Sequence, residues 1–304
     1  MEQLLLLAIC LLIGVALQFV KDFPKNAHQS LNMFVIYVSL PALALYHIPK
    51  IEISTALLFP VGIAWIGFGL SFLFFKGVGT LLGWPRKLIG ALIITAGLGN
   101  TSFVGFPVIE ALYGKEGLQT AIMVDQPGSF LVMATLGIGV ASTYSRGNLS
   151  VGQILKKVLF FPPFLAFLVA TILAFTQTDF PIELQGIWQR LGSTVTPIAL
   201  IAVGLQLSFN FRSKHFPFLG MGLLFKLILT PLFFLVLYKY ILGANGLHID
   251  VSILEAAMPP MITGSIIAIQ YGLKPKLSAM MIGYGIPISF LSLWFWYWLL
   301  NFIG

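Results

Sequence analysis

Long stretches without any Asp, Glu, Lys or Arg follow one another through the whole chain. Seven such stretches are residues 3–20, 26–49, 53–75, 88–109, 158–178, 191–211 and 277–304. Three more carry one charge each, and these are residues 117–145, 215–238 and 251–273. Because about 20 apolar residues cross the hydrocarbon core of a bilayer, each stretch is long enough for one transmembrane helix. The sequence therefore predicts an all-α polytopic membrane protein with ten spans.

The composition excludes several other classes of protein. Only 9% of the residues are charged, whereas soluble domains carry about 25%. The single cysteine, Cys10, excludes a disulfide framework, and the four scattered histidines lack metal-ligand spacing. The net charge of +7 comes from dispersed basic residues, which indicate cytoplasmic loops rather than a nucleic-acid surface. Residues 3–20 lack a preceding basic segment, so we expect a transmembrane helix there and not a signal peptide.

The basic residues also predict the orientation of the spans. With the N-terminus outside, twelve of the seventeen Lys and Arg residues lie in inside loops: Lys21, Lys25, Lys76, Arg86, Lys87, Arg146, Lys156, Lys157, Arg212, Lys214, Lys274 and Lys276. The outside ends contain Lys50, Lys115, Arg190 and Lys239. Because positive residues accumulate in cytoplasmic loops, we expect a multi-pass protein of the cell membrane with both termini non-cytoplasmic.

Two sequence similarities within the chain indicate an internal repeat. Tyr113-Gly114 recurs as Tyr271-Gly272, shifted by 158 residues (271 minus 113), and Pro41 with its apolar neighbours recurs at Pro197, shifted by 156 (197 minus 41). Such offsets are typical of transporters built from repeats. We expect a first repeat at residues 1–145 and a second at residues 146–304. Each repeat holds five spans, and since five is odd, the two must have opposite orientations.

Helix-breaking residues concentrate in the fourth span of each repeat. Residues 97–107 read GLGNTSFVGFP and residues 255–265 read EAAMPPMITGS. Proline lacks a backbone donor and glycine permits unwound dihedral angles. Exposed backbone groups are tolerated at membrane depth only against protein or a wet cavity. A simple proline kink is the alternative, but interruptions at corresponding positions of two repeats favour a substrate site.

The groups that flank the two breaks suit a small carboxylate. Half-helix N-termini, the positive ends of the helix dipoles, stabilise an anion without a lysine. Neutral hydrogen-bonding side chains stand on both sides of the breaks. We therefore expect the substrate-binding residues to be Asn100, Thr101, Ser102, Thr263 and Ser265.

These segments resemble a known family. Residues 100–107, NTSFVGFP, followed by ALYG at 111–114, are similar to the fourth-helix motif of the auxin efflux carrier family, which includes plant carriers and bacterial organic-anion carriers. Residues 256–259 with Tyr271-Gly272 resemble its ninth-helix counterpart, and residues 226–231 resemble its eighth-helix pattern. The resemblance covers the whole chain, although the long cytoplasmic loop of many plant members is missing.

The resemblance implies the ten-helix inverted-repeat fold of bile-acid sodium symporters and sodium/proton antiporters. In that fold, helices 1, 2, 6 and 7 form a scaffold, and helices 3–5 and 8–10 form a transport domain that moves like an elevator. The broken helices 4 and 9 cross, which here involves Gly105, Pro107, Pro259 and Pro260. The family's substrate-contacting asparagine corresponds to Asn100. A homodimer through the scaffold helices is common in this fold, and the sequence leaves it open.

Ionisable residues within the predicted spans supply a second set of candidates. A charge at the bilayer centre costs about 3 kcal/mol, so it needs a partner or a wet pocket. Asp125 lies near the predicted midplane beside Gln126, and we expect it to couple transport to an ion or to gate the substrate; the alternative is an ion pair with Lys226. Glu255 precedes Pro259 by four residues and joins this ion-coupling or gating set. Glu110 faces an outer vestibule in the same interpretation.

The alternatives to an anion carrier are weaker. No nucleophile, base or metal set marks an enzyme, and no charge ring or filter repeat marks a channel. We therefore expect a transporter of small organic anions, auxin-like or other carboxylates, and no cofactor. Proton coupling, sodium coupling and uniport all stay open. The runner-up is a cation/proton antiporter, or a sodium-coupled bile-acid-type symporter, of the same fold.

Overall fold

The computed structural model describes residues 2–24, 26–51, 55–145, 160–206 and 215–303, and its regular elements are helices. Those before residue 146 are α1 (Glu2–Leu17), α2 (Ala27–Phe34), η1 (Val35–Ser39), α3 (Leu40–His47), η2 (Ile48–Lys50), η3 (Thr55–Leu57), α4 (Leu58–Leu81), α5 (Arg86–Gly97), η4 (Thr101–Gly105), α6 (Phe106–Val124), η5 (Asp125–Phe130), η6 (Met133–Gly137) and α7 (Ile138–Tyr144). Those after residue 159 are α9 (Pro162–Phe175), α10 (Ile182–Gly192), α11 (Val195–Gln206), α12 (Phe216–Leu224), η7 (Phe225–Leu229), α13 (Thr230–Leu235), η8 (Val236–Ile241), α14 (Leu247–Ala256), α15 (Ile262–Gln270) and α16 (Pro275–Ile303). Several sequence expectations lie outside the described residues: the boundary at 145/146, and Lys25, Arg146, Lys156, Lys157, Arg212 and Lys214.

Five helical runs are long and apolar enough to cross a bilayer, and they are Ala27–Lys50, Leu58–Leu81, Thr101–Tyr144, Phe216–Ile241 and Pro275–Ile303. Two shorter apolar helices, Ala8–Leu17 and Pro162–Phe175, accompany them. These runs confirm an all-helical polytopic membrane protein. The stretch 251–273 is not one helix, because α14 has 10 residues and α15 has 9. Each is only about 15 Å long, half of the hydrocarbon thickness.

Two glycines with positive φ interrupt the chain after the broken helices. Gly114 interrupts the run that begins at Thr101 and has φ 66° and ψ −158°. Gly272, in the turn between α15 and α16, also has φ 66°. An L side chain is strained in this left-handed region, which glycine enters freely. Both glycines follow a tyrosine, Tyr113 and Tyr271, and so the two similar Tyr-Gly pairs end helices in the same way.

One helix was not anticipated from hydropathy. Residues Ile182–Gly192 form α10, an amphipathic helix between α9 and α11, whereas the sequence reading placed a loop before residue 191. The local signals for this helix were nevertheless present. Pro181 precedes the first turn, Glu183 lies in that turn, and Arg190 lies in the last turn. Acidic residues near the N-terminus and basic residues near the C-terminus both stabilise a helix dipole.

A buried indole replaces the hydrogen-bond donor that is missing at Pro231. Proline has no N–H, so the carbonyl of Leu227, four residues earlier, loses its usual partner. The Trp296 indole Nε1 donates to that Leu227 carbonyl at 2.8 Å, and Trp296 is 2% exposed. Because an unpaired carbonyl in hydrocarbon is costly, this contact stabilises the packing of α16 against η7.

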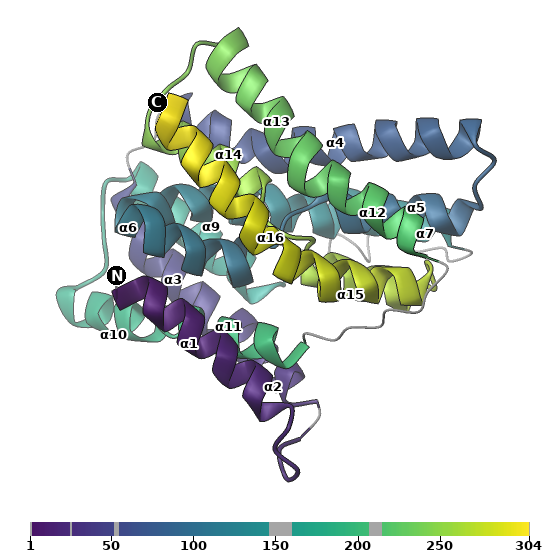
Figure 1. Ribbon diagram of the computed structural model, residues 1–304. Helices are drawn as coiled ribbons and strands as arrows, with labels where there is room; N and C mark the ends of the chain where they lie inside the picture. The colour runs from purple at the N-terminus through teal and green to yellow at the C-terminus, as the bar shows by residue number, and fades with distance from the viewer. Residues whose placement is uncertain (1, 25, 52–54, 146–159, 207–214, 304) are drawn as a thin grey trace.

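The helices pack in two groups. In one, α1 packs against α11, α11 against α2, and α3 against α9 and α10. In the other, α5 packs against α4 and α7, α14 against α6 and α4, and α15 against α16. Figure 1 shows α1, α2, α10 and α11 together on one side, with α4, α5, α12 and α16 on the other. The contacts between the groups include α6 with α1 and η4 with α11.

Two glycines allow α1 and α11 to approach closely. A Cβ at Gly14 would lie 2.3 Å from the Ile201 carbonyl oxygen and 2.8 Å from the Gly204 Cα. A Cβ at Gly204 would lie 2.4 Å from the Leu11 carbonyl oxygen. Lipid tails are as apolar as leucine, so close van der Waals packing of small residues is what holds such helices together.

The substitution Gly14→Ala should therefore destabilise the protein. We expect a loss of about 1–3 kcal/mol from overpacking, measured as a lower melting temperature of the purified protein in detergent. Gly77→Ala is the matched control, since a Cβ at Gly77 meets no atom within 4 Å. Equal melting temperatures for the two variants would show that the α1–α11 contact is not tightly packed.

Candidate functional site

Two interrupted helices meet through their backbones. Between α5 and η4 the chain is extended at Leu98–Asn100, and between α14 and α15 it unwinds at 257–261. The Asn100 N–H donates to the Pro259 carbonyl at 2.7 Å, and the Met261 N–H donates to the Leu98 carbonyl at 3.0 Å. Gly99 and Pro260 therefore face each other in an antiparallel bridge. We name this meeting point of the two interrupted helices the crossing. These buried backbone groups satisfy each other, as hydrocarbon depth requires.

The residues of the bridge suit their places in it. Pro259 and Pro260 donate no hydrogen bond there, because Asn100 and Met261 supply both donors, so the missing N–H groups leave no gap. A Cβ at Gly99 would lie 3.2 Å from both the Glu255 carbonyl oxygen and the Lys226 Nζ. The bridge thus places Pro259 and Pro260 at the crossing itself.

Gly105 and Pro107 lie further along the helix that leaves the crossing. The helix starts at Thr101, and Pro107 is the second residue of α6, so the break precedes both residues. A Cβ at Gly105 would lie 2.6 Å from each carboxylate oxygen of Glu255. Gly105 therefore makes room for an acid from the other broken helix.

Four helix ends converge at the crossing. The helices that start at Thr101 and Ile262 present N-termini there, and α5 and α14 present C-termini. Asn100 caps the first N-terminus, because its Oδ1 accepts from the Phe103 N–H at 3.2 Å. Its Nδ2 is buried and has no hydrogen-bond partner among the described residues. Asn100 therefore keeps a free donor inside the protein.

The ammonium group of Lys226 binds the C-terminal end of α14, where the helix dipole is negative. Its Nζ donates to the Ala256 carbonyl at 2.7 Å, and the side chain is 2% exposed. A cation at a helix C-terminus is stabilised by the helix dipole. In the described ranges the ion pairs are Lys50–Asp179 and Lys239–Asp250, and none joins Lys226 to Asp125.

Asp125 is tied to the first broken helix. The Thr101 Oγ1 donates to Asp125 Oδ1 at 2.6 Å, and the Gln126 Nε2 donates to Asp125 Oδ2 at 2.8 Å. Asp125 is 3% exposed. Glu255 differs, because it is 1% exposed and neither of its carboxylate oxygens has a hydrogen-bond partner among the residues described. The two acids therefore differ in how their charge is stabilised.

A cavity of about 210 Å³ opens beside the crossing, and we name it the Asp125 pocket. Its polar lining is Ser102, Asp125, Gln126 and Thr263. Its apolar lining is Ile36, Leu40, Phe103, Phe130, Met133, Ala134, Ile138, Phe161, Pro163, Met261 and Ile267. Of the expected site residues, Asn100, Thr101, Ser265, Glu255 and Lys226 are buried and do not line this pocket.

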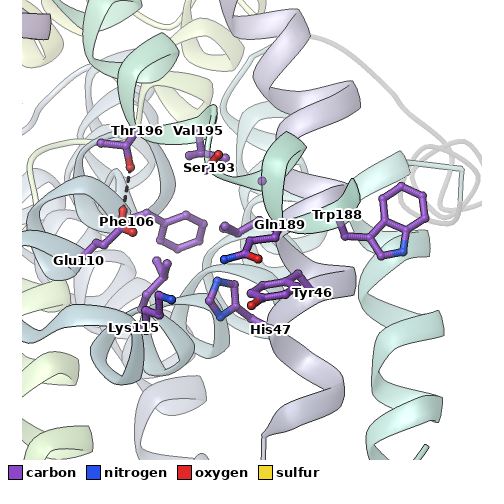
Figure 2. A pocket seen from close by; sticks show the side chains of 13 residues that line it. Tyr46, His47, Phe106, Glu110, Lys115, Trp188, Gln189, Ser193, Val195 and Thr196 are labelled. Atoms are coloured by element: carbon purple, nitrogen blue, oxygen red, sulfur yellow. Dashed lines mark hydrogen bonds between the residues drawn. The ribbon is translucent and has the colours of Figure 1, made fainter. Parts of the chain in front are cut away.

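A second cavity, of about 140 Å³, is named the His47 pocket (Figure 2). Its lining is Leu43, Tyr46, His47, Phe106, Glu110, Lys115, Leu118, Trp188, Gln189, Gly192, Ser193, Val195 and Thr196. The Thr196 Oγ1 donates to Glu110 Oε2 at 3.0 Å, which joins α11 to α6. The sequence reading expected only Glu110 near a vestibule. It missed His47, Lys115 and Gln189, because they are far apart in the sequence and follow no shared pattern.

A helical, apolar protein with two interrupted helices that meet inside it belongs to the class of membrane transporters. The sequence profile of the family described as "Membrane transport protein" matches residues 1–297. The chain belongs to this family, the auxin efflux carrier family, whose members are transporters and not enzymes.

Its relatives include two archaeal proteins and one bacterial protein. An uncharacterized transporter of Methanothermobacter thermautotrophicus is 31% identical over 97% of this chain and 96% of its own length. An uncharacterized transporter of Methanocaldococcus jannaschii is 29% identical over 99% of this chain and 98% of its own. A putative malonate transporter of Rhizobium meliloti is 24% identical over 83% of this chain and 80% of its own.

The close approach of Gly105 to Glu255 generates a testable expectation. Gly105→Ala should displace the Glu255 carboxylate, because the new Cβ would lie 2.6 Å from both oxygens. We expect a stability loss of about 1–3 kcal/mol and slower substrate counterflow in proteoliposomes. Gly139→Ala is the control, since a Cβ there meets nothing within 4 Å. A Gly105→Ala protein with the melting temperature and counterflow of Gly139→Ala would contradict this packing.

Proposed function

We propose that the protein carries small organic anions across the cell membrane by alternating access, with an elevator-type movement of a transport domain. The observation that carries this proposal is the backbone crossing of the two broken helices beside the Asp125 pocket. The crossing brings two helix N-termini to one place, and such ends stabilise an anion. No lysine is required in the pocket wall.

Positions in the two halves support an inverted repeat. Adding the sequence offset of 158 to the extended residues 98–100 gives 256–258, at the end of α14 where the second helix unwinds. The same offset relates Gly114 to Gly272, and both have φ 66°. Two five-helix repeats at residues 1–145 and 146–304 account for both matches. Both crossed helices are then fourth helices of their repeats, numbers 4 and 9 of ten.

The two packing groups support the division into two moving parts. We assign α1, α2, α3, α9 and α11 to the scaffold, and α4 to α7 with α12 to α16 to the transport domain. Both pockets lie between these groups, because each is lined by α3 or η1 from one and by η4 or α6 from the other. A cavity at a sliding boundary opens and closes as the parts move. A homodimer through the scaffold stays a proposal of the same kind.

Basic residues support an orientation with both termini outside. Arg86 donates to the Thr143 carbonyl at 3.1 Å, so α5 begins where α7 ends. A Cβ at Gly272 would lie 3.9 Å from the Lys87 Nζ, so the turn between α15 and α16 lies at this end too. Lys274 belongs to the same turn. Positive residues gather on the cytoplasmic side, so we assign this end to the cytoplasm.

The wall of the Asp125 pocket favours an anion with one carboxylate and an apolar body. It contains three phenylalanines and several aliphatic side chains, but no Lys, Arg or His. A second carboxylate of the ligand would therefore meet an acid or an apolar surface, which is costly. Ser102 and Thr263 place hydroxyl groups at the wall, and the Asn100 Nδ2 is a buried donor without a partner among the described residues. This inference concerns the present chain and not its putative malonate-transporting relative.

Buried acids favour a coupled cation as well. Asp125 and Glu255 are both buried, and one lysine, Lys226, lies with them. We assign proton or sodium coupling to Asp125, with Gln126 orienting it and with Glu255 and Lys226 setting the local charge. The excess of acids over bases is the observation that favours the second candidate function, a cation/proton antiporter or a sodium-coupled symporter of the same fold.

Transport by reconstituted protein tests the main proposal. We expect counterflow of benzoate or phenylacetate and little counterflow of malonate, because of the apolar wall. Asn100→Ala should lower this counterflow by about tenfold and lower the melting temperature only by what the lost helix cap accounts for, about 1 kcal/mol of stability. Asn301→Ala, at an exposed position, is the matched control. Malonate counterflow alone would refute the monocarboxylate assignment. Cation exchange without any anion counterflow would favour the antiporter.

Coupling is tested separately with Asp125→Asn, which preserves shape and removes the titratable group. We expect this variant to exchange substrate for substrate but to lose its response to an imposed pH or sodium gradient. The readout is uptake with and without each gradient, compared with Asp179→Asn at the surface. An unchanged response in a stable Asp125→Asn protein would exclude Asp125 as the coupling residue.

A further inference from the structure

The His47 pocket and the Asp125 pocket lie in series along the same two helices. On the continuous helix α2–η1–α3, Ile36 and Leu40 line the Asp125 pocket, and Leu43 and His47 line the His47 pocket. From Ile36 to His47 this helix rises about 16 Å. On the facing helix, Phe103 lines the Asp125 pocket and Phe106 lines the His47 pocket. The two cavities therefore form successive parts of one path.

An apolar layer separates the two cavities. Leu40 and Leu43 on one helix, and Phe103 and Phe106 on the other, are buried in a single hydrophobic cluster. Phe106 is 1% exposed, so its ring is packed within this layer. A charged ligand cannot rest in this layer, because an unpaired charge in an apolar environment is strongly destabilised. Polar groups for a ligand are therefore found on either side of the layer and not within it.

The polar groups of the His47 pocket suit an anion. In Figure 2 the side chains of His47, Lys115 and Gln189 face a common space below Phe106. His47 is 7% exposed, and in the described part of the chain its ring makes no hydrogen bond. Lys115 is exposed, so the pocket opens to water at that end. Three side chains from α3, α6 and α10 thus bring nitrogen groups to one space, where no acceptor from the described residues binds them.

The one acid in this pocket is already engaged. Glu110 Oε2 accepts from the Thr196 hydroxyl, as the dashed line in Figure 2 shows. Among the ion pairs of the described residues, none joins Lys115 to Glu110. The charge of Lys115 is therefore available to a ligand. The Asp125 pocket has the opposite character, since its wall contains an acid and no cation.

We infer that the His47 pocket is a second binding site, in which Lys115 and Gln189 hold the carboxylate of an organic anion on the far side of the apolar layer. This inference rests on the proposed function, because the ligand is the transported anion. Lys115 supplies the charge, Gln189 and His47 supply hydrogen bonds, and the ring of Phe106 covers the apolar body. In this arrangement the anion binds in the His47 pocket either before it enters the Asp125 pocket at the crossing or after it leaves that pocket.

Fluorescence of Trp188, which lines the pocket, tests the site without transport. The probe is 4-bromobenzoate, whose bromine quenches a nearby indole, and 4-bromobenzyl alcohol is its neutral analogue. We expect saturable quenching by the acid that disappears in Trp188→Phe, which separates Trp188 from the other tryptophans. Quenching by the alcohol that equals quenching by the acid would overturn the inference, since the site would then be merely apolar.

The matched pair of variants is Lys115→Gln and Arg190→Gln. Arg190 is exposed on α10, at the same end of the protein, and does not line the pocket. We expect Lys115→Gln to weaken 4-bromobenzoate binding by about tenfold and Arg190→Gln to leave it unchanged. Equal weakening by both would indicate a general surface charge effect and would overturn the site.

Sided transport then connects the site to the carrier. In oriented proteoliposomes, Lys115→Gln should raise the half-saturating benzoate concentration on the side of α10 and leave it unchanged on the other side. An equal rise on both sides would overturn the assignment to one face. If wild-type protein shows the saturable Trp188 quenching but no carboxylate counterflow, the proposed function fails while the anion site stands.

Discussion

Backbone groups inside a membrane must find partners within the protein, and the crossing depends on this constraint. Two helices stop at Gly97 and Ala256, where no water is available to their broken ends. The chain solves the problem by pairing the two interruptions with each other through Asn100 and Met261 as donors. The prolines of the second interruption are tolerated because neither of them has to donate an N–H to this bridge. One short antiparallel contact thus fixes the broken helices as a unit.

The placement of charge follows from that unit. Two C-terminal ends leave negative dipoles, and Lys226 satisfies the one at Ala256. The two N-terminal ends are left for an anion or for neutral acceptors such as the Asn100 Oδ1. Asp125 holds its place through the Thr101 hydroxyl at the start of η4, so the candidate coupling acid is attached directly to the candidate substrate helix. In our proposal, this hydrogen bond links the protonation or ion occupancy of Asp125 to the position of the broken helix.

The two pockets give the proposed elevator a physical path. Both lie between the packing groups, and both use the same face of the α2–η1–α3 helix. The layer of Leu40, Leu43, Phe103 and Phe106 closes the path in this conformation. The Thr196–Glu110 hydrogen bond spans the same boundary, so a sliding transport domain must break it. In our proposal, the bridge keeps the crossing rigid while these weaker contacts exchange.

The sequence alone determined the membrane class, the two segments at which helices are interrupted and the family, because hydropathy and helix breakers act locally. It also found Asp125, Gln126, Ser102 and Thr263, which the fold gathers in one cavity. It could not predict that Asn100 and Ser265 are buried outside the cavity lining, nor that Lys226 binds a carbonyl instead of an acid, since these arrangements depend on distant segments. The same holds for the His47 pocket, where His47, Lys115 and Gln189 come from three helices. Local patterns decide which segments are helices and where they break, and only packing decides which polar groups meet.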